Sequence, residues 1–138
     1  MNALRHVHTL LMPGGTLVDA HPVTEERVES AHGVVGTISE PVWLGVDLPN
    51  TEEGLRQVVT DGLFTLEAEL AYDVVEHFDE ATDLLEAKRD TLEGQHGLIA
   101  AIQAASLPLS THFRVTARRL RAMPEPATAG ESVRSRRN

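Results

Sequence analysis

The stretch Leu10–Asp19 constrains this chain more than any other, because a helix must end and a strand must begin within it. The Pro-Gly-Gly sequence at 13–15 cannot continue a helix, and its glycines can adopt the positive-φ conformations that close a helix C-terminus. Small and apolar residues dominate 16–20, which is typical of a strand buried on both faces. His21-Pro22 ends this strand because proline lacks a backbone donor. The rest of the chain must cover the strand.

An amphipathic helix is expected before this turn. Its apolar residues recur with the three-and-four spacing of one helical face, and Asn2 can cap its first turn. The apolar set is Ala3, Leu4, Val7, Leu10 and Leu11.

The segment 27–62 predicts a hairpin, an irregular stretch and a helix. Two runs of β-favouring residues, 27–30 and 34–38, flank a short turn, which indicates a small hairpin. Residues 41–49 are expected to be irregular, with Trp43 covering one end of the core. The helix is expected to begin at Asn50, with Glu53 reaching back to the first amides, and to end at Gly62.

Residues 64–123 contain two long strands separated by helices. Apolar and polar residues alternate from 64 to 74, so one face is expected to be buried. Helices are predicted for 79–94, with Asp79 as the cap, and for 96–106, and an extended segment for 112–123. Antiparallel pairing of the two strands brings opposite charges together. The acids are Glu67, Glu69 and Asp73, and the arginines are Arg114, Arg118, Arg119 and Arg121.

The chain is expected to form one domain over residues 1–123, followed by a disordered tail over 124–138. A length of 138 residues suits a single domain. The tail consists mainly of Pro, Ala, Gly, Ser and Arg, which provide almost no apolar surface to bury. The resulting class is α/β with α+β character. It combines a mixed sheet of about three main strands, a long antiparallel pair, a small hairpin and three to four helices.

The helix, the L-x-P-G-G turn and the L-V-D strand resemble the junction into the fifth strand of class I S-adenosylmethionine-dependent methyltransferases. In that family a variable insertion, a helix and a sixth strand follow, and a seventh strand lies antiparallel between the fifth and sixth. The order of predicted elements over 2–123 is similar to that C-terminal half. The resemblance therefore implies a truncated Rossmann-like fold.

The resemblance does not extend to the cofactor-binding parts. In the family, a glycine-rich loop after the first strand and an acid ending the second hold S-adenosylmethionine, and both precede the part that this chain resembles. Gly14 and Gly15 follow a helix and not a strand, so they are not assigned to such a loop. No cofactor, no cofactor-binding residue and no catalytic residue are therefore predicted.

A strand that lacks its usual neighbour presents an open edge. In the family the fifth strand pairs with a fourth, for which this chain has no candidate. An uncharged apolar edge is a template for pairing with another chain. We therefore expect a homodimer or a complex with a separate subunit, through this edge or through the apolar side of the first helix. The candidate interface residues are Thr16, Leu17, Val18, Leu4, Val7 and Leu11.

The densest group of ligand-type side chains is His6, His8, Asp19 and His21. Asp19 and His21 lie on the same side of an extended segment, where they can form an acid–base pair or bind a ligand beside Trp43. A metal site requires His6 or His8 to fold back toward Asp19, and the two-residue spacing of the histidines places them on different helical faces. No metal site is predicted. The simpler interpretation is that Asp19 caps or forms an ion pair and that His21 begins a loop.

Composition excludes several classes. The chain has no cysteine, so disulfides, thiol nucleophiles and cysteine-ligated metals are excluded. Its net charge of −9, with acids concentrated over 52–93, argues against nucleic acid as a partner. No apolar run approaches the length that spans a bilayer, and no leader is recognisable, so no membrane partner and a cytoplasmic location are expected.

Two functions remain. The first is a non-catalytic, methyltransferase-like interaction module that dimerises or completes another protein, as a pseudoenzyme would. The second is an enzyme or small-molecule binder with a pocket near Asp19, His21 and Trp43, assembled in the dimer. The missing cofactor motifs favour the first.

Overall fold

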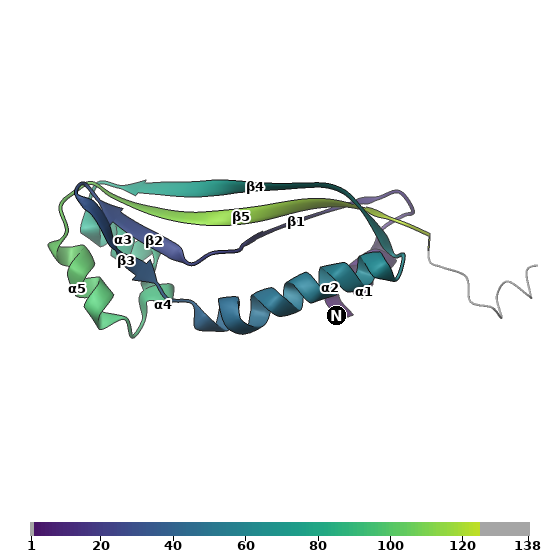
Figure 1. Cartoon of the computed structure of the whole chain (residues 1–138), viewed down its shortest axis with the longest axis horizontal. Helices are drawn as coiled ribbons and strands as arrows, with labels where there is room; N and C mark the ends of the chain where they lie inside the picture. The colour runs from purple at the N-terminus through teal and green to yellow at the C-terminus, as the bar shows by residue number, and fades with distance from the viewer. Residues whose placement is uncertain (1, 125–138) are drawn as a thin grey trace, which may run out of the picture. The chain divides into compact units, whose positions relative to one another are not determined.

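The structure, a computed structural model, describes residues 2–124, and side chains from Ala3 onward (Figure 1). The side chain of Asn2, predicted to cap the first helix, and the predicted tail beyond Pro124 lie outside the described residues. The described chain packs as two compact units. Unit 1 contains the residues up to Asp19, Asn50–Glu69 and those from Arg118, and unit 2 contains Ala20–Pro49 and Leu70–Ala117.

The described residues form an α/β structure with a five-stranded antiparallel sheet and about five helices. The strand order is β1-β5-β2-β3, and β4 also pairs with β5. The elements in chain order are α1 Asn2–Leu10, β1 Thr16–Pro22, β2 Glu26–Ser30, β3 Gly33–Ile38, the π-helix η1 Trp43–Asp47, α2 Leu48–Thr60, β4 Phe64–Phe78, α3 Ala81–Ala87, α4 Arg89–Leu92, α5 His96–Ala104 and β5 Leu109–Ala122.

In unit 1, β5 lies between β1 and β4. The N–H of Ala122 donates to the carbonyl of Gly15, and the N–H of the next residue, Met123, donates to the carbonyl of Leu63. Successive N–H groups of a strand point to opposite sides, so these two neighbours flank β5. Most residues of the buried apolar cluster of this unit come from α2, β4 and β5. Leu4, Leu11 and Leu17 pack against this cluster. Its buried members are Leu55, Val58, Leu63, Phe64, Leu120 and Ala122.

The predicted Pro-Gly-Gly turn is confirmed, and its geometry explains both glycines. Gly14 has a φ of 85°. A Cβ on Gly15 would lie 2.9 Å from the carbonyl oxygen of Met12, closer than real Cβ atoms come to such an atom. The helix stop predicted at Gly62 is confirmed by a φ of 76°.

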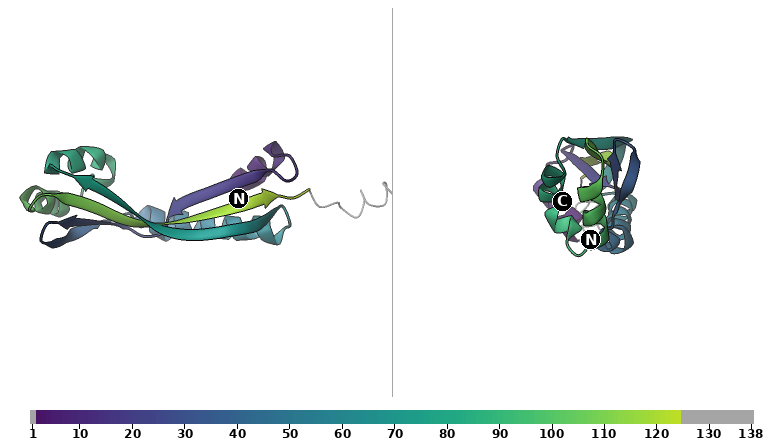
Figure 2. Two further views of the ribbon diagram at one scale, coloured as in Figure 1. Left: turned by 90° about the horizontal axis from the view of Figure 1, so that it is seen from above. Right: turned by 90° about the vertical axis from the view of Figure 1, so that its left-hand side faces the viewer.

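In unit 2, the predicted hairpin is confirmed as β2 and β3, which pair antiparallel from Glu26 opposite Ile38 to Ser30 opposite Gly33. The helices α3, α4 and α5 contact one another, and α5 packs on β3 (Figure 2). Gly36 of β3 lets α5 approach, because a Cβ there would lie 2.8 Å from a methyl carbon of Leu98. The buried core residues of this unit are Val28, Ile38, Leu84, Leu92, Ile102 and Leu109.

Two helix starts differ from the prediction. Residues 41–49 are helical and not irregular, so the helix that was predicted to begin at Asn50 begins at Pro41. Proline suits a first helical position, where its missing N–H is not needed. The start of α3 follows Glu80, with no side-chain cap bond, so the predicted cap at Asp79 is wrong.

The environments of two strands, β1 and β4, also differ from the prediction. β1 is not buried on both faces, because Leu17 packs against the core whereas Val18 is 64% exposed, and the sheet around it is antiparallel. β4 alternates in sequence, but from Leu66 to Asp73 both of its faces are exposed. Among the described residues β4 pairs only with β5, so one of its edges and much of its surface lack a covering element.

Candidate functional site

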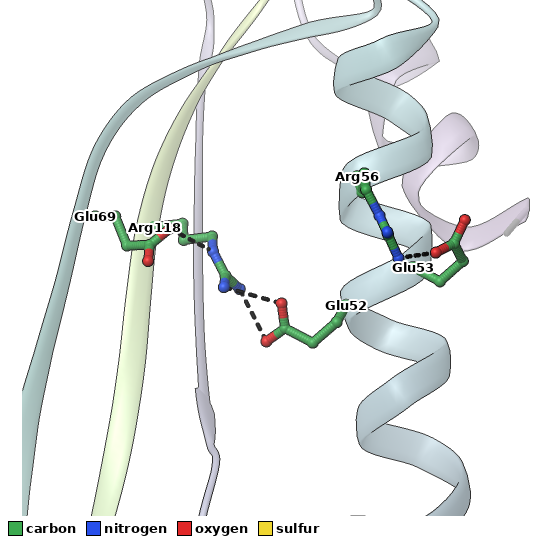
Figure 3. Close-up of polar contacts among 5 residues, drawn as sticks. All are labelled: Glu52, Glu53, Arg56, Glu69 and Arg118. Carbon is green, nitrogen blue, oxygen red and sulfur yellow. Dashed lines mark hydrogen bonds and ion pairs between the residues drawn. The ribbon is translucent and has the colours of Figure 1, made fainter.

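Arg118 of β5 contacts two carboxylates in unit 1. Its side chain is 15% exposed and extends toward α2 (Figure 3). Its Nη1 and Nη2 lie 3.1 and 2.9 Å from the two carboxylate oxygens of Glu52, and its Nε donates to Glu69 of β4 at 3.0 Å. The contact with Glu52 is bidentate, because two nitrogens of the planar guanidinium face the two oxygens of one carboxylate. Arg118 therefore joins three elements of the unit.

Glu52 and Glu69 favour the protonated form of Arg118. Burial alone would lower its pKa, but the hydrogen bonds and negative charges of Glu52 and Glu69 outweigh burial and raise it. Its guanidinium donors already bind carboxylates, which compete with any anionic ligand. We interpret Arg118 as a structural connector between β5, α2 and β4.

An open cavity of about 410 Å³ lies beside Arg118, between α2 and the strands. Its walls are mostly apolar, with Glu52, Arg56 and Thr60 supplying polar atoms. Arg56 pairs with Glu53 on the same helix (Figure 3). The apolar lining residues are Leu55, Val59, Leu66 and Leu120. The cavity can take an apolar group, but none of its side chains forms a nucleophile–base pair.

Lys88 forms the corresponding centre of unit 2. It lies between α3 and α4, and its Nζ is 3.0 Å from Oε2 of Glu26 and 2.8 Å from Oε1 of Glu76. The side chains of Lys88 and Glu26 are only 15% and 9% exposed. Burial alone would lower the pKa of Lys88, but the two glutamates outweigh it and raise that pKa.

Glu40 extends this cluster of charges. Burial raises its pKa, the negative charges of Glu26 and Glu25 raise it further, and Lys88 opposes them. The backbone N–H of Glu40 also donates to Oε2 of Glu25 at 3.0 Å. A cavity of about 280 Å³ adjoins Glu26, Glu40 and Lys88. Burial and the neighbouring acids therefore oppose the ionisation of Glu40.

The structure brings together two of the three predicted ligand-binding residues. The rings of His21 and Trp43 meet edge to face, with centroids 6.1 Å apart, and the Trp43 indole N–H donates to the carbonyl of Pro22 at 3.1 Å. His21 is 6% exposed. These contacts attach the start of η1 to the end of β1. Asp19 lies in unit 1, on the same face of β1 as His21.

The predicted interface residues divide into two groups. Leu4, Leu11 and Leu17 pack against the core cluster of unit 1, and Val7 of α1 is half-buried. Thr16 and Val18 are exposed on β1. The exposed part of the predicted interface is therefore the strand and not the helix.

The two histidines of α1 have different environments. The ring Nε2 of His8 lies 2.7 Å from the carbonyl oxygen of Met123, and the ring meets Phe64 edge to face. His6 is exposed. Within residues 2–124 no three His, Asp or Glu side chains gather in a way that could hold a metal ion. No helix in that range has the length and apolar character to cross a bilayer.

Sequence reasoning missed the contact of Glu52 with Arg118 and the role of Lys88. Glu52 falls near the start of the helix that was predicted from Asn50, and nothing local in the sequence pairs it with an arginine. Lys88, however, lies at helical spacing from Leu84 and Leu92, which are both buried. The sequence therefore indicated that Lys88 lies on the buried face of the helix. A lysine on an apolar stripe points inward and needs a buried acid.

Comparison of the chain with protein-family models, with curated proteins and with solved structures finds no match. A functional assignment therefore depends on the residues and contacts described above.

Proposed function

We propose that this protein is a non-catalytic, methyltransferase-like module of the cytoplasm that acts by forming a homodimer through the open edge of β1. The single observation that carries the proposal is the position of β1 as an end strand of the sheet. An edge strand with little charge invites pairing with another strand. The first strand of the sheet is thus the natural contact for a second copy.

The strand order in unit 1 supports the methyltransferase-like part of the proposal. The order β1-β5-β4 corresponds to fifth, seventh and sixth strands in the family that the sequence resembles, with β5 antiparallel between its neighbours. The glycine turn supports the non-catalytic part. Gly14 and Gly15 follow α1 and precede β1, the opposite order to a strand-then-helix cofactor loop.

The backbone of β1 is oriented for pairing at its outer edge. The carbonyl of Gly15 faces β5, where it accepts from Ala122. Backbone groups alternate along an antiparallel strand, so those of Thr16 and Val18 face the open edge. The exposed Val18 side chain would become partly buried when a second strand pairs there.

Charge favours β1 over β4 as the self-pairing edge. In antiparallel pairing centred on Val18, Asp19 lies opposite Leu17 of the second copy, so no like charges meet. In pairing of β4 with its copy, a centre at Leu70 places Glu67 opposite Asp73, and a centre at Ala71 places Glu69 opposite Asp73. Like charges directly opposite destabilise a strand pair. The acids of β4 thus protect its edge, whereas β1 carries a single acid, Asp19, which pairing centred on Val18 keeps away from its own copy.

The experiment is native mass spectrometry combined with light scattering, alone and with added S-adenosylmethionine. We expect a dimer without a cofactor adduct. The Val18→Lys variant should be monomeric and folded, because the side chain is already 64% exposed and a lysine on the edge opposes pairing.

The matched control is Val42→Lys, which replaces an equally exposed valine, 66%, in a helix. It should remain dimeric. A wild-type chain that stays monomeric at high concentration would contradict the proposal. Dissociation by Val34→Lys in β3 and not by Val18→Lys would place the interface on the other end strand and exclude β1.

A further inference from the structure

A second surface, separate from the β1 edge, lies on the helices of unit 2. The helices α3, α4 and α5 enclose an open groove of about 740 Å³. Its floor contains Leu85, Leu92 and Ile99, one residue from each helix. Leu92 is buried, whereas Leu85 and Ile99 are half-buried. A groove of this volume with an apolar floor is in the range that binds ligands and peptide side chains.

The rim of the groove is acidic. Glu86, Asp90 and Glu93 line it and are exposed, and Arg89 is paired with Glu86 at 3.6 Å. The rim therefore carries more negative charge than its arginine compensates. Such a rim repels phosphate groups and anionic lipid headgroups, and it attracts lysine and arginine.

We propose that this groove, the α3–α5 groove, docks a basic amphipathic segment of a partner protein. The apolar floor takes the apolar face of the segment, and the acidic rim pairs with its lysines and arginines. Charged groups at a rim act mainly on specificity and on the rate of association, while apolar anchors contribute most of the affinity. This mode is the helix-in-groove type of recognition.

The chain itself contains a competing occupant. Its last residues include Val133 and the arginines Arg134, Arg136 and Arg137. A partner segment and this C-terminal segment share the same chemistry, so the experiment must separate them. The proposal does not depend on the homodimer, because every residue of the groove belongs to unit 2.

The test measures fluorescence anisotropy of labelled peptides mixed with the full-length protein. The first probe is a synthetic amphipathic peptide of alternating leucine and lysine clusters at helical spacing. The second replaces its leucines with serine, and the third replaces its lysines with glutamate. Only the first should bind, because docking needs both the apolar floor and the acidic rim.

The protein variant that tests the rim is E86Q/D90N/E93Q. It should weaken binding of the first peptide by roughly tenfold at low salt, because it removes three rim charges. The matched control, D47N/E53Q/D73N, removes the same number of exposed acids outside the groove and should bind as the wild type does. All of these positions are exposed, so both variants should fold.

Three results would overturn the proposal. Equal weakening by both variants would show attraction to net charge only. Equal binding of the serine peptide would show that the apolar floor takes no part. Tighter binding of a peptide with the sequence of residues 125–138 would assign the groove to the chain's own C-terminal segment and not to a partner.

Discussion

Arg118 in unit 1 and Lys88 in unit 2 hold their units together with different chemistry. Each side chain is 15% exposed, and each joins two glutamates from other elements. The acids differ in burial. Glu52 and Glu69 are 35% and 50% exposed, whereas Glu26, beside Lys88, is 9% exposed. Each cation forms two ion pairs, but the loss of Arg118 and the loss of Lys88 are therefore expected to change stability by different amounts.

This difference shows that the stability lost on removing a cation depends on how deeply its acid partner is buried. If Arg118 is lost, water can solvate both of its acids. If Lys88 is lost, Glu26 remains as a charge in the interior, and an uncompensated buried charge is expensive. The cations also differ in titration. A guanidinium keeps its charge at every pH at which a protein is folded, whereas an ammonium can lose its proton in strong alkali.

The largest expected effect is that of Lys88→Met. This change should lower the free energy of unfolding by about 3 kcal/mol at neutral pH, because it leaves Glu26 buried without its cation. The measurement is urea denaturation followed by circular dichroism. Adding Glu26→Gln to Lys88→Met should recover most of the loss, because it removes the uncompensated charge. A double variant no more stable than Lys88→Met would show that lost packing, and not charge, causes the effect.

Arg118→Met should have a smaller effect, roughly 1 kcal/mol, because Glu52 and Glu69 are exposed enough to be hydrated. The same urea denaturation measures it. Arg118→Lys should recover only part of the loss, since an ammonium cannot contact both oxygens of Glu52, and the Nε of Arg118 that donates to Glu69 has no equivalent in lysine. A loss as large as that of Lys88→Met would contradict the burial argument.

The sequence predicted the parts of the fold that depend on local patterns. The Pro-Gly-Gly turn, the hairpin and the helix at α5 each have a signal within a few residues. The pairing of Glu67, Glu69 and Asp73 with β5 arginines is also confirmed, with Arg114 3.1 Å from Asp73 and Arg118 3.0 Å from Glu69. Charge alternation along two strands favours this pairing, because antiparallel pairing places their side chains opposite one another.

Features that depend on tertiary packing were not predictable in the same way. The helix at 41–49 was missed because proline and glycine there resemble a loop, although Pro41 only occupies a first helical position. The exposure of β4 was missed because alternation shows two faces but not whether another element covers one. The contact of Glu52 with Arg118 joins residues 66 positions apart, and no local pattern indicates it.

The smallest expected effect concerns Glu40, whose environment has no equivalent beside Arg118. Because the pKa of Glu40 is raised in the folded protein, the folded state disfavours its ionised form. This cost is absent below the pKa of the unfolded chain and is fully present above the folded pKa. Glu40→Gln should therefore stabilise the protein at neutral pH and leave its stability almost unchanged in acid. Thermal unfolding at several pH values measures the difference, with the exposed Glu80→Gln as the control. A Glu40→Gln variant whose gain does not depend on pH would show that the charge of Glu40 has no part in it.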